Sequence, residues 1–180
     1  MRVTATDLAG VKLIEPKVFG DDRGFFMESW NARAFAAAGI DATFVQDNHS
    51  RSRRGVLRGL HYQIEHAQGK LVRCVAGEVY DAVVDLRRSS PTFGRSIGLA
   101  LSAQNQRMLW VPPGFAHGFL AVSEYADFLY KTTDYWYPEH ERTLLWSDPA
   151  LGIAWPLDGP PTVAAKDAAG RPLASADLYP

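Results

Sequence analysis

Short apolar runs, separated at regular intervals by turn residues, dominate the chain from Val56 to Thr133. Turn signals fall at Gly77, at Ser89–Pro91 and at Pro112–Gly114. Strands of a few residues with turns at such spacing are typical of a β-sandwich or barrel. The sequence therefore predicts a mainly β fold with short peripheral helices, built as one domain over residues 1–180.

A hairpin is the simplest interpretation of the segment around Gly77, because strand-like runs at 70–76 and 78–86 flank it. In the second run, alternate residues from Val79 to Asp85 share one face and those from Tyr80 to Leu86 share the other.

The N-terminal part predicts strands at 11–18 and 25–30, followed by one short helix. Asn31 is a good N-cap, residues 32–38 are helix formers, and Gly39 suits the position after the helix.

Three segments are predicted to be irregular. Residues 19–24 are rich in turn formers, residues 46–50 form a polar stretch, and the tail from Pro138 combines proline, glycine and aspartate. We expect the tail to wrap the sheets with short turns or a small helix.

Composition excludes several function classes. The net charge is −1, so no global basic field exists to hold nucleic acid. No run approaches the ~20 apolar residues that a membrane span needs, and Met1–Gly10 does not resemble a signal peptide. The single cysteine, Cys74, lies in an apolar run and is expected to be a buried thiol, which fits a reducing cytoplasm.

His61 is the first candidate for chemistry. It shares a strand face with Gln63 and follows Arg58, so this face could line a barrel cavity. A structural, hydrogen-bonded histidine is the alternative. Arg58 is the best candidate for pairing with phosphate, because a guanidinium binds phosphate oxygens through two hydrogen bonds.

His117 ends the run Pro112-Pro-Gly-Phe-Ala-His117, which fits the second motif of the cupins, Pro-x-Gly-x-x-His. In the first cupin motif a His-x-His pair supplies metal ligands, but here the matching stretch is His61-Tyr62-Gln63. Zinc and iron prefer imidazole or carboxylate to an amide, so the ligand set is incomplete and no metal site is predicted. His117 is then expected to be a structural histidine at the barrel mouth.

Several motifs in the correct order resemble the dTDP-4-dehydrorhamnose 3,5-epimerase family, over roughly residues 10–170. Motifs that match together are far more specific than any one alone. They are Glu15–Phe26, Phe44–Ser50, Val56–Gln63, Gln68–Cys74, Gly77–Asp81, Ser90–Gly94, Trp110–Phe119, Phe128–Lys131 and Ala165–Asp167.

The resemblance implies a cupin-type jelly-roll homodimer that needs neither metal nor cofactor. Its substrate would be dTDP-4-dehydro-6-deoxy-D-glucose, inverted at C3 and C5 to give dTDP-4-dehydro-L-rhamnose. The 4-keto group lies between these carbons, so both protons are α to a carbonyl and one enolate chemistry can serve both.

The resemblance also assigns catalytic residues. His61 matches the base, Asp167 the carboxylate paired with it, Lys70 the cation near the 4-oxygen, and Tyr130 the acid on the opposite face. A second group is required because a base that returns the proton to the same face gives no net inversion.

Further positions match residues that contact the ligand in the family. Arg58 would meet the diphosphate, and Arg23 would reach the neighbouring subunit's site. Tyr135 and Trp136 would lie near thymine and sugar, although the aromatic run Tyr135–Tyr137 could also simply pack. The remaining positions are Glu28, Gln46, Asn48, Asp81, His117, Glu141 and Lys166.

Three alternatives stay open at this point. A mono-epimerase would invert only C3 or only C5 with the same motifs. A metal cupin would act as an oxygenase or isomerase. A non-catalytic jelly roll would bind carbohydrate without needing a base–carboxylate pair.

Overall fold

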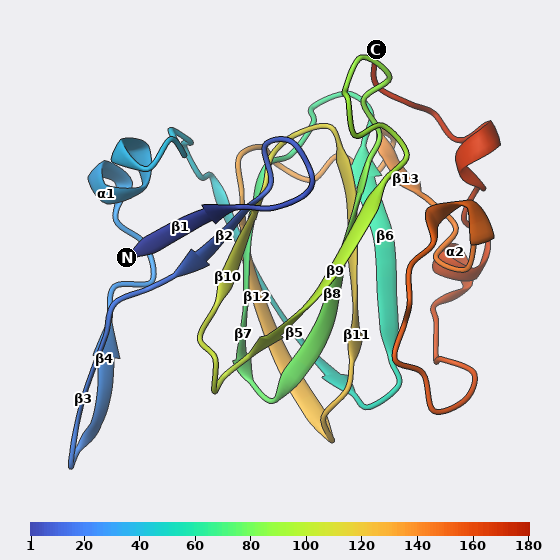
Figure 1. Cartoon of the computed structure of the whole chain (residues 1–180). Coiled ribbons are helices and arrows are strands. Elements are labelled where there is room, and N and C mark those ends of the chain that lie inside the picture. Colours follow the sequence, from blue (N-terminus) through green and yellow to red (C-terminus); the bar gives the residue numbers. More distant parts are fainter.

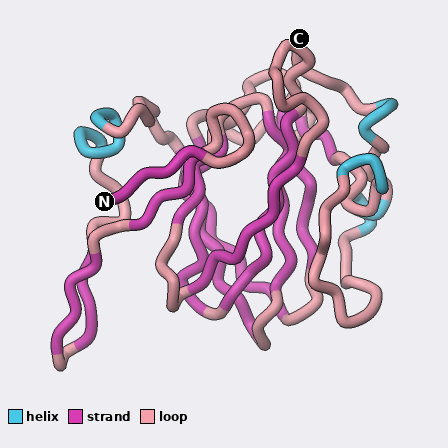
Figure 2. Tube along the Cα trace, in the orientation of Figure 1, coloured by secondary structure: helices cyan, strands magenta, loops and turns pink.

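Two β-sheets packed face to face form the body of the molecule in the computed structural model, which describes all 180 residues (Figures 1 and 2). The first sheet has six strands in the order β1-β2-β10-β7-β12-β5, and the second has five in the order β13-β6-β11-β8-β9. A separate hairpin, β3–β4, extends away from this body (Figure 1). The predicted mainly β jelly roll is confirmed.

The strands of the first sheet are β1 Arg2–Ala5, β2 Lys12–Glu15, β10 Met108–Val111, β7 Lys70–Ala76, β12 Tyr125–Thr132 and β5 Gln46–Arg53. Those of the second are β13 Glu141–Thr143, β6 Leu57–Gln63, β11 Phe115–Ala121, β8 Glu78–Asp85 and β9 Ser96–Ser102. The hairpin is β3 Val18–Asp21 and β4 Gly24–Met27, and the helices are α1 Ala32–Ala37 and α2 Ala165–Ala168, with 3₁₀ turns at Pro149–Leu151 and Leu173–Ser175.

The main core lies between the two sheets. Val79 and Val83 of β8 point into it, whereas Ala82 and Val84 face outward into a second core beneath the C-terminal tail. This split confirms the predicted alternation along β8. A third core, around Phe35 of α1, covers the outer face of the six-stranded sheet.

The predicted hairpin around Gly77 is wrong. β7 pairs with β10 and β12, whereas β8 pairs with β9 and β11, so the chain crosses from one sheet to the other at this glycine. Gly77 has φ +70°, and a side chain there would collide with the backbone of Tyr125. Apolar alternation describes the faces of a strand but does not identify its neighbour.

Two further segments differ from prediction. Residues 46–50 belong to β5, which pairs with β12 along its whole length. Both faces of this strand are polar, so the hydrophobic signal of a strand is missing. Residues 19–24 form the turn end of the β3–β4 hairpin, with a tight turn between Asp21 and Gly24.

The predicted helix is confirmed at Ala32–Ala37. The Asn31 side chain caps its first turn by accepting from Ala34 N at 3.2 Å. No helix in the structure is long and apolar enough to span a membrane.

Candidate active site

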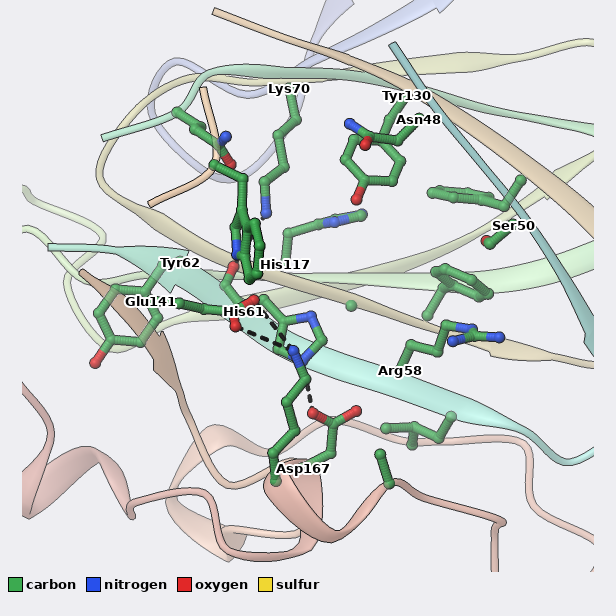
Figure 3. A pocket seen from close by; sticks show the side chains of 18 of the residues that line it. Asn48, Ser50, Arg58, His61, Tyr62, Lys70, His117, Tyr130, Glu141 and Asp167 are labelled. Carbon is green, nitrogen blue, oxygen red and sulfur yellow. Dashed lines mark hydrogen bonds and ion pairs between the residues drawn. The ribbon is translucent and has the colours of Figure 1, made fainter. Parts of the chain in front are cut away.

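A cavity of about 630 Å³ opens between the sheets, and most of the predicted site residues line it (Figure 3). Those that line it are Gln46, Asn48, Arg58, His61, Lys70, His117, Tyr130, Trp136, Glu141, Lys166 and Asp167. They come from both sheets and from the tail, so residues more than a hundred positions apart meet here.

His61 and Asp167 form the closest pair in the cavity. The Nε2 atom of His61 lies 2.6 Å from Oδ1 of Asp167, and the other carboxylate oxygen accepts from Gly59 N at 3.1 Å. Helix α2 carries Asp167 onto the middle of β6, and the Asp167 side chain is almost fully buried. The His61 side chain stays 24% exposed, so it can still reach a ligand.

Asp167 is held as a carboxylate. Burial alone would raise the pKa of its carboxyl, but hydrogen bonds from His61 and Gly59 together with the charge of Lys166 outweigh burial and lower the pKa. Because a carboxylate can only accept, Nε2 of His61 carries the hydrogen and Nδ1 keeps its lone pair.

Two glycines let the strands that carry both histidines approach closely. Gly59 has φ +124°, and a Cβ there would lie 2.6 Å from Gly118 Cα. Within the pairing of β6 with β11, His61 lies directly opposite His117, next to a register irregularity at Gly118. The sequence therefore places two imidazoles side by side on the cavity wall.

Lys70 is a buried cation in the cavity wall. Its Nζ donates to the backbone oxygen of His61 at 3.2 Å, and no carboxylate lies within ion-pair distance. Burial lowers the pKa of its ammonium to about 8, against the opposing influence of Glu141 and Asp81. A proton on Lys70 is thus available near neutral pH and is lost just above it.

Tyr130 places its phenol in the same cavity (Figure 3). It comes from β12 in the six-stranded sheet, whereas His61 comes from β6 in the five-stranded sheet. Its hydroxyl makes no hydrogen bond within the chain, and burial raises the pKa of the phenol. Tyr130 is therefore protonated at neutral pH and free to donate to a ligand.

Four predicted residues do not line the cavity. Asp81 is fully buried behind His117, whose Nε2 lies 2.9 Å from Asp81 Oδ2. It therefore holds a histidine in place, whereas we expected it beside the sugar. Tyr135 is half-exposed next to the cavity residue Trp136.

The other two, Arg23 and Glu28, lie on and just after the β3–β4 hairpin, away from this chain's cavity. Arg23 pairs with Asp21 at 2.5 Å and its side chain is 89% exposed. Neither residue is among those that line the cavity of its own chain.

Ser50 lines the cavity and was not predicted. It follows Gln46 and Asn48 on the inner face of β5, and its hydroxyl is buried without a partner, as is Nδ2 of Asn48 (Figure 3). Alternation along 46–50 could have identified it had this segment been interpreted as a strand.

No three His, Cys, Asp or Glu side chains lie close enough together to hold a metal ion. The amide of Gln63, at the position of a cupin ligand, is instead hydrogen-bonded to the backbone of three other residues. Cys74 is buried, as predicted, and burial raises the pKa of its thiol to about 11.

The fold and site define a class of protein: an acid–base enzyme in which a histidine–carboxylate pair, a buried ammonium and a phenol surround one ligand cavity. A sequence model described as dTDP-4-dehydrorhamnose 3,5-epimerase matches residues 5–175. The chain belongs to this family of sugar epimerases, as its motifs predicted.

Individual relatives agree with the family match. The dTDP-4-dehydrorhamnose 3,5-epimerase of Pseudomonas aeruginosa is 61% identical over the full length of both chains. The crystal structure of dTDP-6-deoxy-D-glucose-3,5-epimerase from Legionella pneumophila, in complex with dTDP-4-keto-L-rhamnose, superposes with a TM-score of 0.96 at 50% identity, covering 99% of this chain and 97% of that one. A 3'-monoepimerase from Streptomyces bikiniensis, in complex with dTDP-quinovose, has a TM-score of 0.89 at 34% identity, covering 94% and 87%.

Proposed function

We propose that the chain catalyses the 3,5-epimerisation of dTDP-4-dehydro-6-deoxy-D-glucose to dTDP-4-dehydro-L-rhamnose, within dTDP-rhamnose and deoxysugar biosynthesis. The observation that carries this proposal is the His61–Asp167 pair at 2.6 Å, set beside Lys70 and Tyr130 in one cavity. The relative that is 61% identical over its whole length supports the same substrate and reaction.

His61 acts as the base. Its Nδ1 lone pair takes the proton from the carbon next to the 4-keto group, and the electrons of that C–H bond form the enolate. Asp167 holds Nε2–H and stabilises the imidazolium that results, since a buried carboxylate next to a charged ring is a favourable pair.

Lys70 and Tyr130 complete the step. The Lys70 ammonium stabilises the negative charge that develops on the 4-oxygen. Tyr130 delivers a proton to the carbon from the face opposite His61, which inverts the centre and leaves Tyr130 as a phenolate and His61 as an imidazolium. His61 releases its proton to solvent and Tyr130 takes one from solvent, so both groups are restored before the second α carbon reacts. The same sequence at the other α carbon completes the double inversion without a redox cofactor.

The rest of the cavity binds the nucleotide diphosphate. Arg58 and Lys166 supply positive charge for the phosphates, and Trp136 offers a ring against which thymine can stack. Gln46, Asn48, His117 and Glu141 offer polar groups for the sugar and base.

The dimer is part of this proposal, because Arg23 and Glu28 do not line the cavity of their own chain. The hairpin exposes Phe19, Phe25 and Phe26, which are 54%, 63% and 66% exposed. Such an apolar arm favours a second copy of this chain as its partner. Arg23 would then complete the partner's diphosphate site.

Nuclear magnetic resonance of the dTDP-4-keto sugar with the enzyme in deuterium oxide tests activity and regiochemistry together. We expect deuterium at C3 and C5 and conversion to the L-rhamno product. Tyr130→Phe should spare exchange at C3 more than net inversion at C5. Binding with no exchange at any carbon would contradict the proposal and favour a carbohydrate-binding jelly roll, whereas stoichiometric iron, manganese or zinc required for activity would favour a metal cupin.

A mono-epimerase is the second candidate, and the 34% identical 3'-monoepimerase is the observation that favours it. Deuterium at only one of the two carbons would select it. A cytoplasmic location is proposed with either activity, because it suits a nucleotide-sugar enzyme with one buried, unpaired cysteine.

A further inference from the structure

The loop between β12 and β13 carries Tyr135 and Trp136 to the cavity, and side chains hold most of its backbone. Between Asp134 and Trp136 no peptide group hydrogen-bonds to another backbone group. An isolated loop of this kind would be mobile, because nothing regular fixes its backbone. Side chains supply the missing partners: Thr132 donates to Asp134 O and Asp134 Oδ1 accepts from Tyr135 N, and the other bonds come from glutamines.

Gln63 holds this loop at two points. Its Nε2 donates to the backbone oxygens of Tyr135, at 3.2 Å, and His66, at 2.7 Å, while Oε1 accepts from Tyr137 N at 2.7 Å. The residue is 3% exposed, so these bonds are shielded from water. One buried amide thus fixes the residues on both sides of Trp136.

Gln68 and Gln46 act on the same loop. Gln68 Nε2 donates to Asp134 O at 2.9 Å, and Gln46 Oε1 accepts from Trp136 N at 3.3 Å. Gln46, Gln63 and Gln68 all line the cavity, and they come from β5, from β6 and from the loop just before β7. The loop is therefore attached to both sheets through amide groups.

The hydrogen bonds of Gln63 leave it little to offer a ligand. Both hydrogens of its amide are donated to backbone oxygens, and its oxygen is already accepting. Its position next to His61 is the one at which a metal cupin carries a ligand, and here the side chain binds backbone instead.

We propose that Gln63 and Gln68 are positioning residues that fix the Tyr135–Trp136 loop and thereby set the affinity for the nucleotide base. This rests on the proposed function, in which Trp136 stacks on thymine. The two glutamines act through the loop and touch neither the reacting carbons nor the phosphates. Their loss should raise KM for the dTDP sugar while leaving kcat much less affected.

The test uses Gln63→Met and Gln68→Met, which keep the side-chain length and remove every hydrogen bond. Gln104→Met is the matched control, because Gln104 is exposed and makes no hydrogen bond. Calorimetry measures the Kd of each protein for dTDP and for inorganic pyrophosphate, which lacks the base. We expect the Kd for dTDP to rise about tenfold, the scale of one lost base–aromatic stack, with the Kd for pyrophosphate nearly unchanged.

Trp136→Ala separates positioning from general damage. If the glutamines act through the ring, adding Gln63→Met to Trp136→Ala should cause no further loss of dTDP affinity. The proposal would be overturned if Gln63→Met weakened the binding of dTDP and of pyrophosphate equally. It would also be overturned if Gln63→Met weakened dTDP binding as much in the Trp136→Ala protein as in the wild type. Gln68→Met, at a half-buried position, gives the same comparison if Gln63→Met does not fold. A wild-type protein that binds dTDP but shows no solvent exchange would instead contradict the proposed reaction alone.

Discussion

Two histidine–carboxylate pairs lie side by side in this molecule, and they differ in the hydrogen bonds that their carboxylates accept. His61 with Asp167 and His117 with Asp81 are joined at 2.6 and 2.9 Å, and the two histidines face each other across β6 and β11. The His61 side chain is 24% exposed, whereas that of His117 is 7% exposed.

The carboxylates account for the difference. Asp167 gains a second donor, Gly59 N, and its pKa is lowered despite burial. Asp81 is sealed in the interior with Oδ1 unpartnered, and burial raises its pKa although His117 and Lys70 oppose this. A carboxylate with a hydrogen bond at each oxygen can stabilise an imidazolium that forms and disappears in each turnover, whereas one with an unpartnered oxygen is better suited to holding a neutral ring.

Replacing each histidine by asparagine should give the largest contrast. His61→Asn removes the base, so we expect turnover and C3/C5 exchange to fall by about 10³-fold or more. His117→Asn should act mainly on KM, because this ring lines the cavity and its carboxylate partner, Asp81, is held in the interior. Exchange measured in deuterium oxide, with circular dichroism and thermal unfolding as the folding control, distinguishes the two. Comparable losses in exchange for both variants would remove the distinction between the pairs.

Replacing the two carboxylates should give a contrast in the same direction as the histidine variants, but a smaller one. Asp167→Asn keeps the shape and removes the charge behind the base, so kcat should fall by about 10²-fold. Asp81→Asn should lower kcat by only a few-fold, since the charge of Asp81 is already disfavoured. Steady-state kinetics on both variants test this, and a larger loss for Asp81→Asn would reverse the assignment of roles.

Much of the fold could be predicted because its local signals agree. The helix after Asn31 and the alternation of β8 follow from capping and from a period of two, both of which are local. The sheet crossing at Gly77 and the polar strand β5 could not be predicted this way. Strand pairing is a long-range property, and β5 is stabilised by the backbone of β12 instead of by an apolar face of its own.

The site was predictable mainly through motifs. His61, Lys70, Tyr130 and Asp167 meet as the family resemblance implied, although Asp167 is over a hundred residues from His61. Asp81 has the inward direction that its strand face predicted, but depth within the interior is not encoded in alternation. The role of Gln63 depends on a loop that only the tertiary structure brings to it.

Lys70 interacts with residues of both pairs, because its Nζ donates to the backbone oxygen of His61 and Asp81 raises its pKa. Its titration should limit the rate at alkaline pH. Burial lowers its pKa to about 8, and only the protonated form stabilises the enolate. Thus kcat/KM should hold between neutral pH and about pH 8 and fall about tenfold per pH unit above that. Tyr130 cannot cause this decline, because its pKa is raised. In Lys70→Met we expect a low rate without the decline, and an unchanged decline in that variant would assign it to another group.

The smallest expected effect is a shift in the alkaline decline of kcat/KM, caused by the influence of Asp81 on the pKa of Lys70. The negative charge of Asp81 raises the pKa of Lys70 against the influence of burial, and Glu141 does so more strongly. Removing that charge in Asp81→Asn should therefore lower the pKa of Lys70 further and move the alkaline decline in kcat/KM to lower pH. Glu141→Gln is the positive control and should move the decline further in the same direction. If Asp81→Asn leaves the decline in place while Glu141→Gln moves it, Asp81 is neutral in the working enzyme, and its role is limited to orienting His117.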